Sequence, residues 1–131
     1  MAYDSLLQLT GTSGNPVETV ATSAAGTAVF VGANRLCHAD LRIATTVTGT
    51  SPTLTISIQG STAATTGFST IVAFPQQTTA MTGEPGTGPI TVSFRTGSTP
   101  YIRIDKTAGG TSPSFQGVSV LLRPTGEPAV P

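Results

Sequence analysis

One stretch of eleven residues occurs twice in this chain and restricts its possible folds more than any other feature. The first copy, residues 42–52, reads Arg-Ile-Ala-Thr-Thr-Val-Thr-Gly-Thr-Ser-Pro, and the second, residues 103–113, reads Arg-Ile-Asp-Lys-Thr-Ala-Gly-Gly-Thr-Ser-Pro. Seven of the eleven positions match at a constant offset of 61. Apolar residues precede each copy and an alternating run follows it. The Gly, Ser and Pro residues between such runs predict strand, turn and strand, used twice.

The alternation of apolar and polar residues predicts an all-β chain. Residues 53–59 show it most clearly, with Leu54, Ile56 and Ile58 expected to point inward and hydroxyl residues between them outward. Other expected strands cover residues 28–31, 41–47, 68–74, 90–94, 101–106 and 115–122. Gly117 lies one residue out of the register of the first copy, which predicts a β-bulge. About eight short strands without a long helix favour an antiparallel β-sandwich or jelly-roll-like fold.

At 131 residues the chain has the length of one domain with extensions. Residues 1–27 are predicted to be an N-terminal arm with short strands at 6–10 and 17–22, or an extended arm that becomes ordered only against a neighbouring subunit. Residues 28–122 are predicted to form the β-sandwich domain, with a long Gly- and Pro-rich loop at 75–89. Residues 123–131 contain three prolines and are predicted to be an extended tail without regular structure.

The composition is unusually poor in charge. Only 9% of residues are charged, against about 25% in ordinary domains, and the formal net charge is zero. The 25 threonines suit the outer faces of strands. Because little charge repulsion keeps copies apart, we expect other subunits to cover much of the surface. No basic patch suggests a nucleic-acid partner, and no apolar run approaches the length of about 20 residues that a membrane span requires.

The side chains that could carry chemistry do not form a recognisable site. Cys37, His38 and Asp40 are close in sequence, but neighbours on a strand point to opposite faces, and a structural zinc site needs four ligands. We therefore expect no metal, cofactor or catalytic residues and no enzyme activity. Arg42 and Arg103 occupy matching places in the repeat. They either bind an anion or carboxylate at a subunit interface or lie over the sheet with the guanidinium in water, and we favour the second interpretation.

Two segments resemble small structural proteins of tailed bacteriophage particles. Residues 56–61 and 66–71 follow a pattern of strand, Gly-Ser, loop and Gly-Phe-x-x-Ile. Residues 101–104 and 107–120 follow a pattern of Tyr-x-Arg, Gly-Thr-Ser-Pro-Ser-Phe and Val-Ser-Val. Within that class the chain is most similar to capsid decoration (cement) proteins.

This resemblance implies a β-rich subunit on the capsid surface that stabilises the phage head by bridging neighbouring capsomers. It implies synthesis in the host cytoplasm, the major capsid protein as partner, and a homo-oligomer for which a trimer is favoured. Other possibilities are a tail or neck structural protein and a carbohydrate-binding β-sandwich module. The arm, the 75–89 loop and the tail are expected to reach across subunit boundaries. Removal of residues 1–15 is then expected to leave the core folded but abolish capsid binding.

Overall fold

The computed structural model describes residues 8–11, 17–44, 46–78 and 90–125, and this part of the chain consists of strands and their connections without a helix. The strands are β1 (Glu18–Val20), β2 (Ala24–Ala25), β3 (Val29–Phe30), β4 (Leu36–Ile43), β5 (Val47–Ser61), β6 (Ser69–Ala73), β7 (Ile90–Arg95) and β8 (Tyr101–Thr125). The all-β, antiparallel prediction is confirmed. A search of the described residues for a helix able to cross a membrane finds none.

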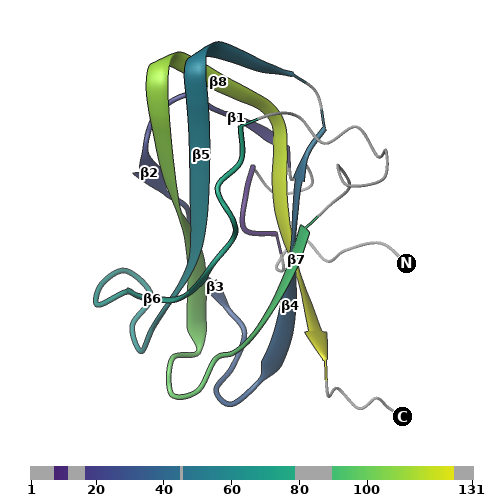
Figure 1. Cartoon of the computed structure of the whole chain (residues 1–131). Coiled ribbons are helices and arrows are strands. Elements are labelled where there is room, and N and C mark those ends of the chain that lie inside the picture. The colour runs from purple at the N-terminus through teal and green to yellow at the C-terminus, as the bar shows by residue number, and fades with distance from the viewer. Residues whose placement is uncertain (1–7, 12–16, 45, 79–89, 126–131) are drawn as a thin grey trace.

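All eight strands belong to one antiparallel sheet that bends on itself into a nearly closed barrel (Figure 1). The order is β6-β5-β8-β4-β7, and β1, β2 and β3 also pair with β8. Strands β1, β2 and β3 lie on the side of β8 opposite to β4 and β5. For example, Asp105 of β8 has Ser57 of β5 on one side and Ala25 of β2 on the other. At the far ends of the sheet, β6 and β7 contact each other. Strand β8 is therefore the central strand of the fold, since β1, β2, β3, β4 and β5 all pair with it.

The inward face of the sheet forms one continuous hydrophobic core. Leu54, Ile56 and Ile58 are at most 1% exposed, so their predicted inward orientation is confirmed. Strand β8 contributes buried side chains from both of its halves, and β4 contributes every second residue. The largest fully buried residues are Phe115, Leu41, Ile43, Leu54, Ile56, Ile58, Ile102, Ile104, Leu122, Val118, Val120 and Cys37. The charge-poor sequence thus folds around a hydrophobic core of mostly aliphatic residues and three phenylalanines, supplied largely by alternating strand positions.

The prediction that each repeat copy forms a hairpin is wrong. Strand β5 runs unbroken through residues 48–52 and β8 through residues 107–113. The two copies instead pair antiparallel with each other, with Thr50 opposite Thr111. The pairing follows the repeat. Leu54 pairs with Ala108, and the equivalent residues of the other copy, Phe115 (61 positions after Leu54) and Val47 (61 positions before Ala108), also pair with each other. The copies are therefore related by a local pseudo-two-fold axis at the Thr50–Thr111 pair.

Irregular backbone, rather than chain reversal, explains the turn-forming residues of the repeat. The register of β5 against β8 shifts on both sides of Thr50. Gly49 and Gly110 have φ angles of 113° and 98°, and Ser51 and Ser112 both have φ of 48°. These conformations are common in turns, but here they form bulges inside a continuous ribbon. The Gly-Thr-Ser-Pro sequence predicts a turn, but the structure has a bulge at this point in each strand.

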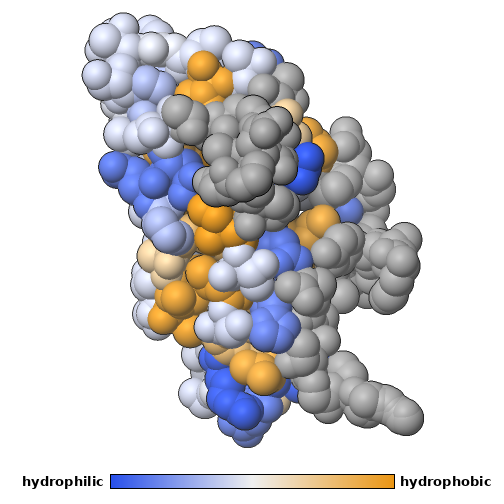
Figure 2. Space-filling view, turned by 45° about the vertical axis from the view of Figure 1, so that its right-hand side comes forward, coloured by the Kyte–Doolittle hydropathy of each residue, from blue (hydrophilic) through white to orange (hydrophobic). Residues whose placement is uncertain are grey.

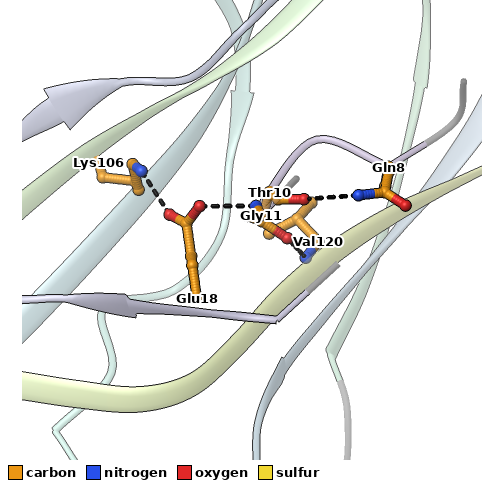
Figure 3. Close-up of polar contacts among 6 residues, drawn as sticks. All are labelled: Gln8, Thr10, Gly11, Glu18, Lys106 and Val120. Carbon is orange, nitrogen blue, oxygen red and sulfur yellow. Dashed lines mark hydrogen bonds and ion pairs between the residues drawn. The ribbon is translucent and has the colours of Figure 1, made fainter. Parts of the chain in front are cut away.

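The described part of the predicted N-terminal arm is built into the fold of its own chain. Leu9 and Val20 are core residues, 3% and 2% exposed. Thr10 is held from both sides: its Oγ1 accepts a hydrogen bond from the Val120 amide (3.0 Å), and its carbonyl oxygen accepts one from the Gln8 side chain (3.1 Å) (Figure 3). The idea of an arm ordered only against a neighbouring subunit is therefore wrong for residues 8–11 and 17–27. Residues 1–7 and 12–16 lie outside the described residues.

A carboxylate ties the N-terminal segment to β8. Glu18 Oε1 accepts a hydrogen bond from the Gly11 amide (2.7 Å), while its Oε2 forms an ion pair with the Lys106 ammonium (Figure 3). Both side chains are mostly buried, with 22% of Glu18 and 12% of Lys106 exposed. Two steps along β1, from Glu18 to Val20, correspond to three steps along β8, from Val118 to Phe115. Gly117 lies in that interval with φ of 71°, so the predicted bulge is confirmed.

Two other predictions concern the connections and the C-terminus. Residues 123–125 were predicted to begin an irregular tail, but they are the last residues of β8 and pair with β4, Thr125 opposite Leu36. Of the predicted 75–89 loop, the described part includes Gln77, which forms a bridge with Leu54 of β5. Residues 79–89 and 126–131 lie outside the described residues.

Candidate functional site

The residues weighed for metal or nucleophilic chemistry diverge in the structure. The Cys37 side chain is fully buried in the core, whereas His38 points outward from β4, with its Nδ1 2.6 Å from Ser93 Oγ. Asp40 Oδ1 accepts a hydrogen bond from the Thr91 hydroxyl (2.6 Å). These contacts are cross-strand polar pairs between β4 and β7. Within the described ranges, no three His, Cys, Asp or Glu side chains are grouped as a metal site would require.

The two matching arginines of the repeat have different surroundings. Arg42 is exposed on the outer face of β4, opposite Ser119 of β8. Arg103 is half-buried, and its Nε donates a hydrogen bond to Gln59 Oε1 (2.8 Å). The Arg103 guanidinium carbon also lies 4.1 Å from the centre of the Phe68 ring, a cation–π contact. Only the second arginine is therefore held in a fixed position by two neighbours from other parts of the sheet.

One aromatic ring contacts this ordered arginine, and a pair of aromatic rings lies next to it on the outer side of the barrel. Tyr101 and Arg103 alternate along β8 with the buried Ile102. Phe30 of β3 pairs with Tyr101, and their ring centres are 5.3 Å apart at 70°, an edge-to-face contact. Because Gln59 and Phe68 contact Arg103, the group extends across β3, β8, β5 and the residue just before β6. We call Phe30, Gln59, Phe68, Tyr101 and Arg103 the aromatic–arginine surface.

The composition of the aromatic–arginine surface suits binding to a protein better than catalysis. Phe30 is 65% exposed, the highest value among the exposed large apolar residues of the described chain. Aromatic and arginine side chains dominate the binding energy of many protein interfaces. Burying one Phe side chain contributes about 1.5–3 kcal/mol. Contacts to Gln59 and Phe68 already restrict Arg103, so less rotamer entropy is lost when a partner binds.

The rest of the surface is consistent with a protein that meets other proteins. Figure 2 shows apolar groups that reach the surface on one face, between residues of near-neutral hydropathy and scattered hydrophilic ones. The exposed parts of the repeat add hydroxyl groups rather than charges: Thr50, Ser51, Thr111 and Ser112 are all exposed. A surface of this kind gives little electrostatic steering and little repulsion between neighbours.

Four members of this surface lie in segments that the sequence singled out, but their proximity was not predicted. Gln59, Phe68, Tyr101 and Arg103 all occur in the segments that resemble phage structural proteins. Phe30 was predicted only as part of the strand at residues 28–31. Its size, compared with the Ala and Val residues around it, was the only sign in the sequence that it could form a contact surface. No model of a known protein family matches the chain, and no curated protein matches it significantly.

Proposed function

We propose that this chain is a structural protein of a tailed-bacteriophage particle, a capsid decoration subunit with a jelly-roll-like β fold. It would bind the major capsid protein on the outside of the shell and stabilise the head by bridging capsomers. The observation that carries the proposal is the aromatic–arginine surface on a charge-poor, compact β framework. The resemblance of residues 56–61, 66–71, 101–104 and 107–120 to phage structural proteins supports it, because four of the five surface residues lie in those segments.

A rigid surface changes how the subunit would hold the capsid. Flexible arms lose roughly 1–2 kcal/mol of backbone entropy per residue when they become ordered on a partner. Residues 8–11 and 17–31 are already ordered against β8, so they incur no such cost. In the proposed mechanism the outer face of the β3–β8–β5 region makes the contact. Many identical contacts on one shell would then add avidity to a modest single-site affinity.

The repeat provides a matched pair of variants to test this mechanism. Arg103→Ala removes the ordered guanidinium, whereas Arg42→Ala removes the equivalent arginine of the other copy, which is exposed and outside the aromatic–arginine surface. Each purified variant would be added to particles that lack this protein, and the bound fraction measured after sedimentation. We expect Arg103→Ala to weaken binding at least about tenfold, as for an interface hot spot. Arg42→Ala should bind like the original protein.

A second variant separates surface contacts from charge. Phe68→Ala removes the ring under Arg103 and should also weaken binding, with circular dichroism used to verify the fold. Equal binding by Arg103→Ala, Phe68→Ala and Arg42→Ala would refute the proposed surface. Binding to isolated tails but not to heads would assign the chain to the tail or neck. Binding of the isolated chain to a glycan array, blocked by Phe68→Ala, would instead indicate a carbohydrate-binding module.

A further inference from the structure

The N-terminal strands form an edge of the sheet that consists of three short pieces, of three, two and two residues. Strands β1, β2 and β3 each pair with β8, and in the part of the chain that the structure describes no strand pairs with their outer side. An unpaired strand edge presents backbone N–H and C=O groups that can pair with another chain. The edge segment is defined as residues 19–31, which include most of β1 and all of β2 and β3.

The edge segment lacks the side chains that usually protect such an edge. Natural edges are protected by charged residues or proline, or by very short strands, and here only the short strands are present. Residues 19–31 contain neither Asp, Glu, Lys, Arg nor Pro. The charge just before the segment, Glu18, is engaged by Lys106. Two copies of the edge segment can therefore face each other without like charges from the segment itself, and the half-buried Asp105 opposite Ala25 lies one strand further from the joint.

Exposed side chains along the edge segment also fit a second copy. Ala24, Ala25 and Thr27 are exposed and small, so another backbone can approach closely. Phe30 at one end is 65% exposed, and Val17, just before the segment, is 46% exposed. These two are among only three exposed large apolar residues in the described ranges. The opposite end of the sheet is different, because β6 and β7 contact each other and β7 ends in Arg95.

We propose that two copies of this chain associate through their edge segments, antiparallel and related by a two-fold axis. A two-fold interface uses the same patch twice, so the patch must complement itself. A neutral edge with small central residues and an apolar residue at the end meets that requirement. This inference concerns pairing between copies and stands whether or not the partner of the aromatic–arginine surface is a capsid protein. The two surfaces share Phe30, while the other four members of the aromatic–arginine surface lie outside the edge segment. It differs from the trimer that the resemblance implies.

The test introduces like charges into the proposed joint. The original protein should elute with a mass of twice 13.2 kDa in size-exclusion chromatography with light scattering. Ala25→Lys/Thr27→Lys places two positive charges on each edge segment and should weaken dimerisation at least about tenfold. The matched control is Thr62→Lys/Ala64→Lys, which adds the same charges in the exposed connection after β5. The control should remain a dimer.

A charge-reversal experiment distinguishes repulsion at the joint from damage to the fold. Ala25→Glu/Thr27→Glu alone should be monomeric, and mixing it with the lysine variant should restore the dimer mass. The proposal is overturned by a monomeric original protein at about 100 μM, a hundredfold above a micromolar dissociation constant. It is also overturned by a trimer mass, by a dimeric lysine variant, or by a mixture of the two variants that remains monomeric.

Discussion

At positions 49 and 110 the chain has no room for a side chain. A Cβ atom on Gly49 would lie 2.7 Å from the carbonyl oxygen of Ser112, and one on Gly110 would lie 2.5 Å from that of Ser51. Both glycines also have φ angles, 113° and 98°, that side chains rarely allow. Each glycine therefore permits the close approach of the other copy of the repeat.

Alanine at either of these glycines should strongly destabilise the fold. We expect Gly49→Ala and Gly110→Ala each to lower the free energy of unfolding by at least about 2 kcal/mol, because backbone strain and collision with backbone atoms add. Urea denaturation followed by circular dichroism would measure this. Gly97→Ala is the control, since Gly97 has φ of 57° but open space around it, and should cost about 1 kcal/mol. Equal effects at all three positions would contradict the packing of the two copies.

Among the elements, the N-terminal segment contributes to the core and to β8, although it looks dispensable in the sequence. Leu9 belongs to the core and Thr10 accepts a hydrogen bond from the Val120 amide. Removal of residues 1–15 should therefore destabilise the whole protein rather than only abolish binding. Loss of a buried leucine alone typically costs about 2–5 kcal/mol. Thermal unfolding should show a clearly lower midpoint for the truncated chain, and Leu9→Ala should reproduce part of the decrease. An unchanged midpoint would restore the interpretation of these residues as an independent arm.

The presence of strands and the inward or outward orientation of their side chains could be predicted, but the pairing of the strands could not. Alternation identifies Leu54, Ile56 and Ile58 as inward residues because burial of one face requires a period of two. The continuity of β5 through residues 48–52 was missed because Gly-Thr-Ser-Pro has the same local preference in a bulge as in a turn. Only contact with the second copy, far along the chain, decides between them.

The candidate site shows the same limit. Tyr101 and Arg103 could be placed on one outer face by their spacing, and the resemblance drew attention to Gln59 and Phe68. Their convergence depends on the register of β5 against β8, which sets Gln59 opposite Arg103. The place of Phe30 depends on β3 pairing with the start of β8. Neither pairing follows from local sequence, because other strands lie between the paired segments in the chain: β6 and β7 between β5 and β8, and β4 to β7 between β3 and β8.

In the whole molecule, the two halves marked by the repeat share one core. Strands β4 and β5 lie along the full length of β8, from Leu36 opposite Thr125 to Ser61 opposite Tyr101. The first half thus obtains its main strand partner from the second. We infer that the repeat units cannot fold independently, although their sequences match.

Division of the chain tests this interdependence directly. A cut between Ala64 and Thr65 falls in the exposed connection after β5 and separates β5 from β8. Each fragment alone should give the amide proton spectrum of an unfolded chain, because Leu54 and Ile58 on one side and Ile104 and Val118 on the other would lose their shared core. An equimolar mixture should recover the dispersed spectrum of the intact protein, since the cut removes only the entropic benefit of a covalent link. A folded spectrum from either fragment alone would show that a single copy suffices, and the pseudo-two-fold pairing would then be a consequence of folding rather than a requirement for it.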